Sequence, residues 1–269
     1  MTDFVAKYFE EKKIEYFAVT AYAHQREINP GIIKRENFTP KSVIIYLLPY
    51  YSGETVNISR YASSLDYHLI ISEINKGLCE TLHSQFPNAR MRGYGDHSPI
   101  DERYAALIGG LGILGDNGLL INEKYGSYVF IGDMLTDIEP ELLLAREPGK
   151  IETCHSCGAC KRACPTGILS GASSECLSSI TQKKGELCDL EISLMRSYNT
   201  AWGCDECQKS CPYNKDPRMT PIDFFEKDRI PHLTEEILDN MTGDEFERRA
   251  FAWRGRKTVE RNLKLLKNG

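Results

Sequence analysis

The chain has 269 residues, 41% of them hydrophobic and 26% charged, which is the composition of an ordinary soluble globular protein. Its formal net charge of −5 argues against an extensive nucleic-acid-binding surface. No apolar run approaches the roughly 20 residues that span a bilayer, and the N-terminus lacks the apolar core of a signal peptide. We therefore expect a cytoplasmic protein with no membrane partner.

The first half of the chain alternates between predicted helices and strands. The run KSVIIYLLPY at 41–50 is continuously apolar and rich in β-branched residues, which is typical of a buried strand. Such alternation predicts a layered α/β (α+β) domain over residues 1–145. In chain order we predict a helix over 3–13, strands over 16–22 and 41–50, a long helix over 66–86, a short helix over 101–108, a glycine-rich loop entering a strand over 109–122 and a strand over 126–137.

Nine of the ten cysteines lie between Cys154 and Cys211. Structural disulfides are rare in cytosolic proteins, so this clustering indicates metal binding. The group CHSCGACKRACP at 154–165 has the spacing of bacterial two-cluster ferredoxins, in which the fourth cysteine binds the other cluster. Zinc fits less well, because zinc ribbons favour well-separated C-x2-C pairs. The remaining Cys79 falls in the long predicted helix, where we expect it to be buried and inert.

The second group, WGCDECQKSCPYN at 202–214, is one ligand short of the ferredoxin pattern, because Ala201 stands where that pattern has a cysteine. Both Cys176 and Cys188 are candidates for the missing ligand, and spacing does not choose between them. We expect a ferredoxin-like electron-transfer domain over 150–218 with two [4Fe-4S] clusters. The cross-over pattern assigns Cys154, Cys157, Cys160 and Cys211 to one cluster, and Cys164, Cys204 and Cys207 to the other.

The end of the chain is helical in pattern and basic. We predict a helical extension over 219–269, clearest at 241–250 and 257–266. Eight Lys or Arg stand against a single acid, Glu260, between residues 248 and 269. A basic tail over 248–267 can bind the phosphates of a nucleic acid. A solvated amphipathic helix explains the same charges equally well.

Several blocks, in one order, resemble the epoxyqueuosine reductase family, the cobalamin-dependent enzymes that complete queuosine synthesis on tRNA. These blocks are SRYASSLDYH at 59–68, GDHSPIDERYAALIGGLGILGDNGLLIN at 95–122, GSYVFIGDMLTD at 126–137 and both cysteine groups, with a fainter match at 248–262. The family carries a lone cysteine between the two groups, and SECLSSIT at 174–181 takes that place. The resemblance therefore implies that Cys176 is the eighth ligand and that Cys188 is free.

The same resemblance implies a base-off cobalamin on an N-terminal cobalamin-type domain, close to one cluster. Electrons would enter from an external donor of the flavodoxin or ferredoxin type and pass through the clusters to cobalt. The family's proton-donating acid falls on Asp96, whose pKa we expect burial to raise. The alternative for Asp96 is a helix N-cap before Pro99 and Glu102.

Further contacts to cobalamin follow from the resemblance alone. Glycines 109, 110, 112 and 115 would let the backbone approach the corrin ring, or would simply serve a tight turn. The candidate contacts carried over are Arg60, Tyr61, Tyr67, His68, Asn122 and Ser127.

Three departures from the family bear on the substrate. Ile113 replaces an aromatic residue, and Asp116 replaces a basic residue and would repel phosphate. Tyr213 replaces a tryptophan, and the helical-repeat segment that follows in typical members is expected to be missing. Three functions are therefore compatible with the sequence. They are an epoxyqueuosine reductase acting on tRNA, a related corrinoid reductase with a small substrate, and an iron–sulfur electron carrier that reduces a corrinoid partner protein.

Overall fold

The computed structural model describes residues 4–35 and 38–267, and it divides into two compact units. The first unit comprises the described residues up to Pro49 together with His68–His155. The second unit comprises Tyr50–Tyr67 and the described residues from Ser156 onward. The cysteine region from Ser156 onward and the C-terminal helices, expected as separate domains, thus lie in one unit, whereas Cys154 falls in the first unit.

The segment 50–67, which the sequence places in the N-terminal domain, belongs instead to the second unit. Ile58 forms an isolated β-bridge with Trp202, and Leu65 forms another with Arg249. Ile58 also packs in the same apolar core as Phe251. These partners lie far along the chain, so local sequence patterns do not reveal them.

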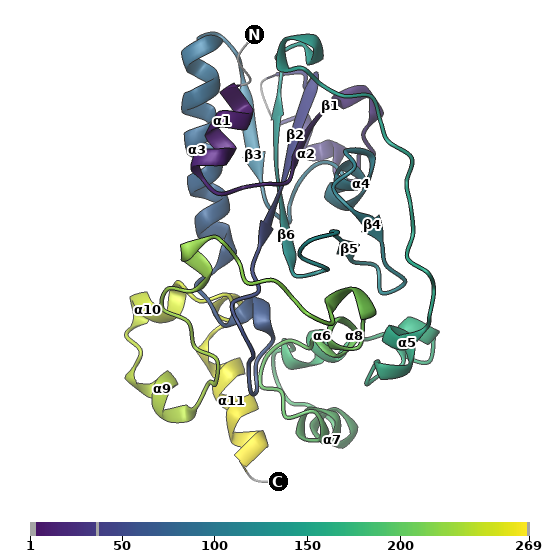
Figure 1. Cartoon of the computed structure of the whole chain (residues 1–269). Coiled ribbons are helices and arrows are strands. Elements are labelled where there is room, and N and C mark those ends of the chain that lie inside the picture. The colour runs from purple at the N-terminus through teal and green to yellow at the C-terminus, as the bar shows by residue number, and fades with distance from the viewer. Residues whose placement is uncertain (1–3, 36–37, 268–269) are drawn as a thin grey trace. The chain divides into compact units, whose positions relative to one another are not determined.

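The first unit is built on an antiparallel sheet of four strands in the order β1-β2-β6-β3, seen in Figure 1. Every residue of β2 is buried, as its continuously apolar sequence predicts. The short, polar β3 has no alternating pattern, and we did not predict it. The strands are β1 (Phe17–Ala21), β2 (Ser42–Pro49), β3 (Met91–Tyr94) and β6 (Val129–Thr136), with a separate hairpin of β4 (Ile113–Leu114) and β5 (Leu120–Ile121).

Helices cover both faces of this sheet. In Figure 1, α1 (Phe4–Glu11) and α3 (Tyr67–Gln85) lie on one side of it and α4 (Glu102–Ile108) on the other. Val43, Ile45 and Leu47 of β2 pack in the core that α4 completes. The intervening Tyr46 points to the opposite face, where its hydroxyl donates to the Asn75 Oδ1 of α3 at 3.1 Å. The short α2 (Pro30–Ile33) lies between β1 and β2 in the chain.

The second unit is helical, and its core surrounds Trp202 and Phe251, both fully buried. Within it α5 packs against α8, α6 against α7, and α11 against both α7 and α9. The helices are α5 (Ala159–Ala163), α6 (Leu177–Thr181), α7 (Asp189–Ser197), α8 (Glu206–Lys209), α9 (Glu235–Asn240), α10 (Gly243–Glu247) and α11 (Arg256–Lys267). Among the helices of the described residues, none combines the length and hydropathy that a membrane span needs.

Candidate functional site

Asp96 lies in the loop between β3 and α4, at the centre of a tight turn. The backbone N–H of His97 donates to the Gly95 carbonyl at 2.8 Å, and Asp96 itself has a φ of 64°. This left-handed conformation is uncommon outside glycine, although aspartate tolerates it better than most residues. The Asp96 side chain is 49% exposed, and its Oδ2 lies 3.6 Å from the Nε2 of His68. The burial that we expected for this carboxyl is therefore not present.

The N-cap of α4 is Asp101, whose side chain accepts the Tyr104 N–H at 3.1 Å. The N-cap alternative for Asp96 is therefore wrong. Just before the cap, the Pro99 carbonyl accepts the backbone N–H groups of both Ile28 and Asn29. These contacts fix the loop that carries Asp96 to the segment that follows β1.

A buried carboxyl, Asp133, and a partly buried one, Glu102, lie close to Asp96 in the fold. Asp133 of β6 is fully buried, and burial raises its pKa to about 7, although the Ser98 hydroxyl donates to Oδ2 at 2.8 Å. Its other oxygen, Oδ1, has no hydrogen-bond partner among the described residues. Burial, reinforced by the nearby charges of Asp133 and Asp96, raises the pKa of Glu102 to about 8. Near neutral pH Glu102 is therefore mostly protonated, as a general acid must be, whereas Asp133 is about half protonated.

A pocket of about 370 Å³ opens beside these acids. Its polar wall comes from the Asp96 loop and the start of α4, and its apolar floor comes from β6. The lining residues are Ile28, Asp96, Asp101, Glu102, Arg103, Val129, Phe130 and Ile131. Sequence reasoning selected Asp96 but missed Glu102 and Asp133. The available signal was an acid at position 133 inside an otherwise apolar strand.

In the second unit, the helices that carry the two cysteine groups are neighbours. Cys160 lies on α5 and Cys207 on α8, and these helices pack together. Partial burial opposes ionisation of the Cys164 thiol. Hydrogen bonds to its sulfur outweigh this effect and lower its pKa, and they come from the backbone N–H groups of Leu169, Thr166 and Gly167 and from the Thr166 hydroxyl. Donors arranged around a sulfur in this way stabilise the thiolate that an iron ligand requires.

Cys204 has two other thiols close by. Burial raises its pKa to about 12, and the charges of Cys176, Asp205 and Cys207 add to that rise, although the Glu206 N–H opposes it. Cys176 is therefore near enough to act electrostatically on Cys204. Cys188 is exposed at the N-cap of α7, where its backbone N–H donates to Glu191 at 2.9 Å.

The segment around Cys176 is held in place from two directions. The Lys183 ammonium pairs with Glu175 at 2.6 Å and also with Glu191. The fully buried Asn262 of α11 donates its amide to the Thr181 carbonyl at 2.6 Å and to the Ala201 carbonyl at 2.7 Å. Asn262 thus joins the segment that follows Cys176 to the segment that precedes Cys204, a role that the sequence did not suggest.

Ala201 itself is fully buried within the apolar core of the second unit. Its backbone N–H donates to the Asn57 carbonyl at 2.6 Å. The position at which a ferredoxin would have a ligand is therefore part of the hydrophobic core here.

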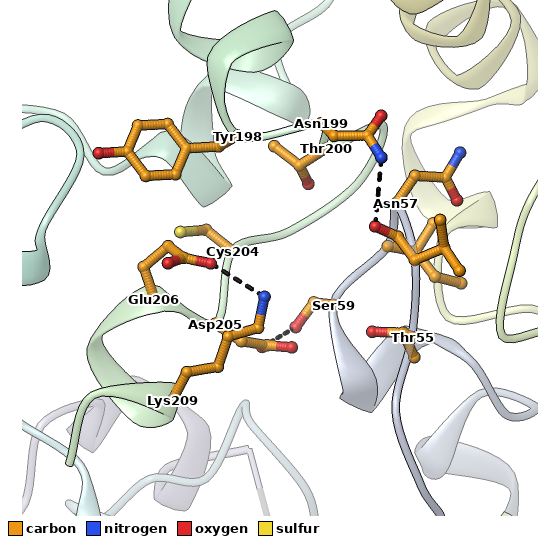
Figure 2. Close-up of a pocket in the computed structure, with 12 residues that line it drawn as sticks. Thr55, Asn57, Ser59, Tyr198, Asn199, Thr200, Cys204, Asp205, Glu206 and Lys209 are labelled. Carbon is orange, nitrogen blue, oxygen red and sulfur yellow. Dashed lines mark hydrogen bonds and ion pairs between the residues drawn. The ribbon is translucent and has the colours of Figure 1, made fainter.

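Figure 2 shows the surroundings of Cys204, beside a small cavity of about 20 Å³. The adjacent Asp205 turns its carboxylate to Ser59, whose hydroxyl donates to it. The same carboxylate accepts the backbone N–H of Arg60 at 2.7 Å and pairs with the Arg60 guanidinium at 3.4 Å. Burial raises the pKa of Asp205, while Ser59 and Arg60 lower it. Asp205 therefore fixes segment 59–60 against the second cysteine group.

The residues carried over as cobalamin contacts fall in both units, and their role stays a prediction. Arg60 is buried and also pairs with Glu54, and the Tyr61 hydroxyl accepts the Trp202 indole N–H at 3.0 Å. Tyr67 begins α3. In the first unit, the buried Asn122 donates to the Leu111 carbonyl at 2.9 Å, and Ser127 is buried.

None of the ten cysteines, all of which lie within the described residues, forms a disulfide. The Cys154 Sγ accepts the backbone N–H of Asp116 at 3.3 Å. Partial burial raises the pKa of Cys79, which suits an unreactive thiol. Within residues 4–35 and 38–267, no three His, Cys, Asp or Glu side chains are placed to hold a single metal ion. The thiolates of a cubane bind separate iron atoms and need not converge in that way.

Part of the basic tail serves the structure of the second unit. Arg249 donates to the Asp228 carbonyl at 2.5 Å, Arg256 to the Leu238 carbonyl at 2.5 Å, and Arg261 to the Gly185 carbonyl. Arg254 stacks on Trp253, whose side chain is 58% exposed, at 3.8 Å from the ring centre. The charges of the tail are thus divided between structural contacts and the surface.

Two known family models match parts of this chain, one in the cysteine region and one in the N-terminal half. Residues 153–214 match the family model described as a 4Fe-4S double cluster binding domain, and residues 36–97 match the one described as Epoxyqueuosine reductase QueG, DUF1730. The epoxyqueuosine reductase of Listeria monocytogenes is 31% identical over 288 residues, which cover 95% of this chain and 72% of that relative. The Synechocystis enzyme is 32% identical over 242 residues, which cover 81% of each chain.

Solved structures show the same fold. A selenomethionine-labelled epoxyqueuosine reductase superposes with a TM-score of 0.80 at 23% identity, covering 98% of this chain and 80% of that one. The Streptococcus thermophilus enzyme gives 0.79 at 24% identity, covering 97% and 79%. The mixed α/β fold and the double-cluster region define an iron–sulfur oxidoreductase. Within that class, the chain belongs to the epoxyqueuosine reductase family.

Proposed function

We propose that this protein reduces epoxyqueuosine to queuosine in tRNA, with two [4Fe-4S] clusters and cobalamin as cofactors. The observation that carries the proposal is the acid-lined pocket at Asp96, in a chain that also has a double-cluster domain. A relative of the same fold was crystallised with an epoxyqueuosine-modified tRNA-Tyr stem loop. A cytoplasmic location and an external flavodoxin or ferredoxin donor belong to the same proposal.

Eight cysteines are assigned to the clusters. For the second cluster, the support is the closeness of Cys176 and Cys207 to Cys204 and the hydrogen-bond donors around Cys164. Cys188 is left outside the set. The first cluster would take Cys154, Cys157, Cys160 and Cys211, and the second Cys164, Cys176, Cys204 and Cys207.

Cobalamin is assigned to the first unit. The half-buried side chains of Val129, Phe130 and Ile131 give the pocket an apolar floor, which suits a flat and largely apolar macrocycle. Asp96 and the nearby His68 lie at its polar side. When bound, low-valent cobalt would supply reducing equivalents to the substrate.

Asp96 is assigned as a proton donor to the epoxide oxygen. The tight turn presents its carboxyl at the pocket, and its half-exposed position leaves it accessible to a substrate. A C–O bond breaks more readily when the departing oxygen receives a proton, which is the contribution of a general acid.

The tRNA would meet the exposed part of the basic tail. Arg248, Lys257 and Lys264 are exposed, and cations of this kind bind phosphate. The exposed Trp253 offers a ring on which an unpaired base could stack.

The test is a reconstituted reaction. The protein is purified without oxygen, loaded with iron, sulfide and cobalamin, and incubated with a low-potential reductant and epoxyqueuosine-bearing tRNA. We expect about eight iron atoms per chain, one cobalt, and conversion of the nucleoside as measured by mass spectrometry. Conversion of the free nucleoside but not of the tRNA would instead indicate a reductase for a small substrate. Absence of both conversions would reject the proposal.

Asp96→Asn should lower kcat by about 10²- to 10⁴-fold, because the amide cannot supply the proton. Iron and cobalt contents should stay unchanged, since the substitution keeps the size of the side chain. The control is Glu73→Gln, an exposed carboxylate on α3 that pairs with Lys12. If kcat of Asp96→Asn matches that of the control, Asp96 is not the acid.

A further inference from the structure

Removal of an epoxide oxygen as water needs more than one proton. Both C–O bonds break, a C=C bond forms, and the oxygen leaves with two protons while two electrons enter. On the proposed function, the electrons come from an external one-electron donor through the iron–sulfur clusters. Asp96 carries one proton for each turnover, so a second donor must serve the same oxygen.

Glu102 meets the geometric requirement for that donor. It lines the same pocket as Asp96, and its carboxyl accepts the backbone N–H of Asp96, which holds the two residues side by side. It is less exposed than Asp96, because it lies at the first position of α4 over the sheet. Arg103, the nearest cation in the sequence, donates instead to the Gly118 carbonyl at 2.8 Å.

We propose that Glu102 is the second proton donor of the reaction, and that it and Asp96 together supply the two protons of the departing water. This inference rests on the proposed function. The charged groups that act most strongly on Glu102 are all acidic, namely Asp133 on β6, Asp96 in the loop and Asp101 at the N-cap. They oppose its ionisation, and so the pocket wall keeps this carboxyl protonated while the exposed Asp96 exchanges with solvent.

Asp133 acts on Glu102 as a positioning residue. It does not line the pocket, and its Oδ2 is engaged by the Ser98 hydroxyl. Its Oδ1 is buried and has no partner within the part of the chain that the structure describes, so a negative charge there is costly. When two neighbouring carboxyls are withdrawn from solvent, the negative charge of one opposes ionisation of the other, so the charge of Asp133 favours the protonated form of Glu102.

The first test is the pH profile of the reconstituted holoenzyme on epoxyqueuosine-bearing tRNA. The wild-type rate should fall as pH rises through about 8, because Glu102 then loses its proton. Glu102→Gln keeps an oxygen for the Asp96 N–H but has no proton to give, so kcat should fall by about 100-fold or more and this limb of the profile should disappear. Glu102→Asp should restore part of the rate.

The pH profile of Asp133→Asn distinguishes proton donation by Glu102 from a purely structural role. If Glu102 were only structural, the position of the alkaline limb would not depend on Asp133. Removal of the buried acid should shift the alkaline limb to lower pH while circular dichroism reports an intact fold. Glu73→Gln is the control for a lost surface charge and should leave the profile unchanged. An alkaline limb that persists in Glu102→Gln, or that does not move in Asp133→Asn, overturns the inference.

Infrared spectroscopy separates this inference from the proposed function. At pH 7 the holoenzyme should show the carbonyl stretch of a protonated carboxyl that is absent from Glu102→Gln. If the wild type leaves the modified tRNA unreduced, the proposed function fails, and the band still decides whether Glu102 is an acid poised at the pocket. If the band is missing at pH 7, Glu102 is ionised and the inference is rejected.

Discussion

At the scale of single residues, Cys176 and Cys188 show what local sequence can and cannot decide. Spacing leaves both available as the eighth ligand, and only the family resemblance favours Cys176. The structure adds a reason to propose Cys176, because the charge of this thiol raises the pKa of Cys204. The proximity arises from contacts of Lys183 and Asn262 with distant parts of the chain.

Cys176→Ser should therefore remove or convert one cluster, lowering the iron content by up to half and changing the electron paramagnetic resonance of the reduced protein. Cys188→Ser is the matched control, and its iron content and spectrum should equal those of the wild type. The reverse pattern would make Cys188 the ligand. Equal spectra for both variants would place the eighth ligand elsewhere.

At the scale of elements, segments with a clear apolar pattern were predictable, the short helix at 101–108 included, whereas β3, which has no such pattern, was not. The strand predicted at 41–50 is β2, and the helix predicted at 66–86 is α3, because apolar periodicity reflects burial directly. The sequence also indicated Asp96 through its family block. It did not indicate Glu102 or Asp133 as acids of the site, because their proton affinity arises from tertiary burial.

Gly132 of β6 leaves room for a buried side chain of the neighbouring strand β2. It lies directly opposite Tyr46 in the register of β2 and β6, and a Cβ atom there would meet the Tyr46 ring at 2.4 Å. The ring is fully buried and anchored to Asn75 of α3. It therefore cannot move aside without disturbing the packing of α3 on the sheet.

Gly132→Ala should therefore destabilise the protein by about 1–3 kcal/mol, the usual cost of overpacking a core. The measurement is the midpoint of thermal unfolding of the reconstituted protein. Gly31→Ala in α2 is the control, because a Cβ there meets no atom of the described residues outside its own helix within 4 Å. Its midpoint should be unchanged or slightly raised. Equal midpoints for the two variants would show that the Tyr46 ring adapts.

At the scale of the whole molecule, two carboxyls with raised pKa values make stability depend on pH. Asp133 titrates at about 7 in the folded protein against an ordinary 3.8, and Glu102 at about 8 against 4.5. Between the ordinary pKa and the raised pKa of each carboxyl, the folded state binds more protons than the unfolded state. The stability that these groups contribute is complete below about pH 4 and is lost as pH rises through 7 and 8.

Stability should thus decline from about pH 5 to pH 8, by up to about 1.4 kcal/mol per pH unit for each carboxyl. Thermal unfolding midpoints across this range provide the measurement. Asp133→Asn should flatten the decline between pH 5 and pH 7, whereas the exposed Glu73→Gln should not. A wild-type midpoint that rises steadily over the same range would contradict these assignments.

The two hydrogen bonds of the Asn262 amide have a consequence for the order in which the parts of the second unit become available during translation. The amide joins the segments beside Cys176 and Cys204, yet it lies downstream of every cysteine in the chain. During translation all the thiols emerge before the residue that joins these two segments. On the ligand assignment proposed above, the second cluster would acquire its complete scaffold only after α11 has been synthesised, whereas its ligands would be exposed to iron, oxygen and one another before then.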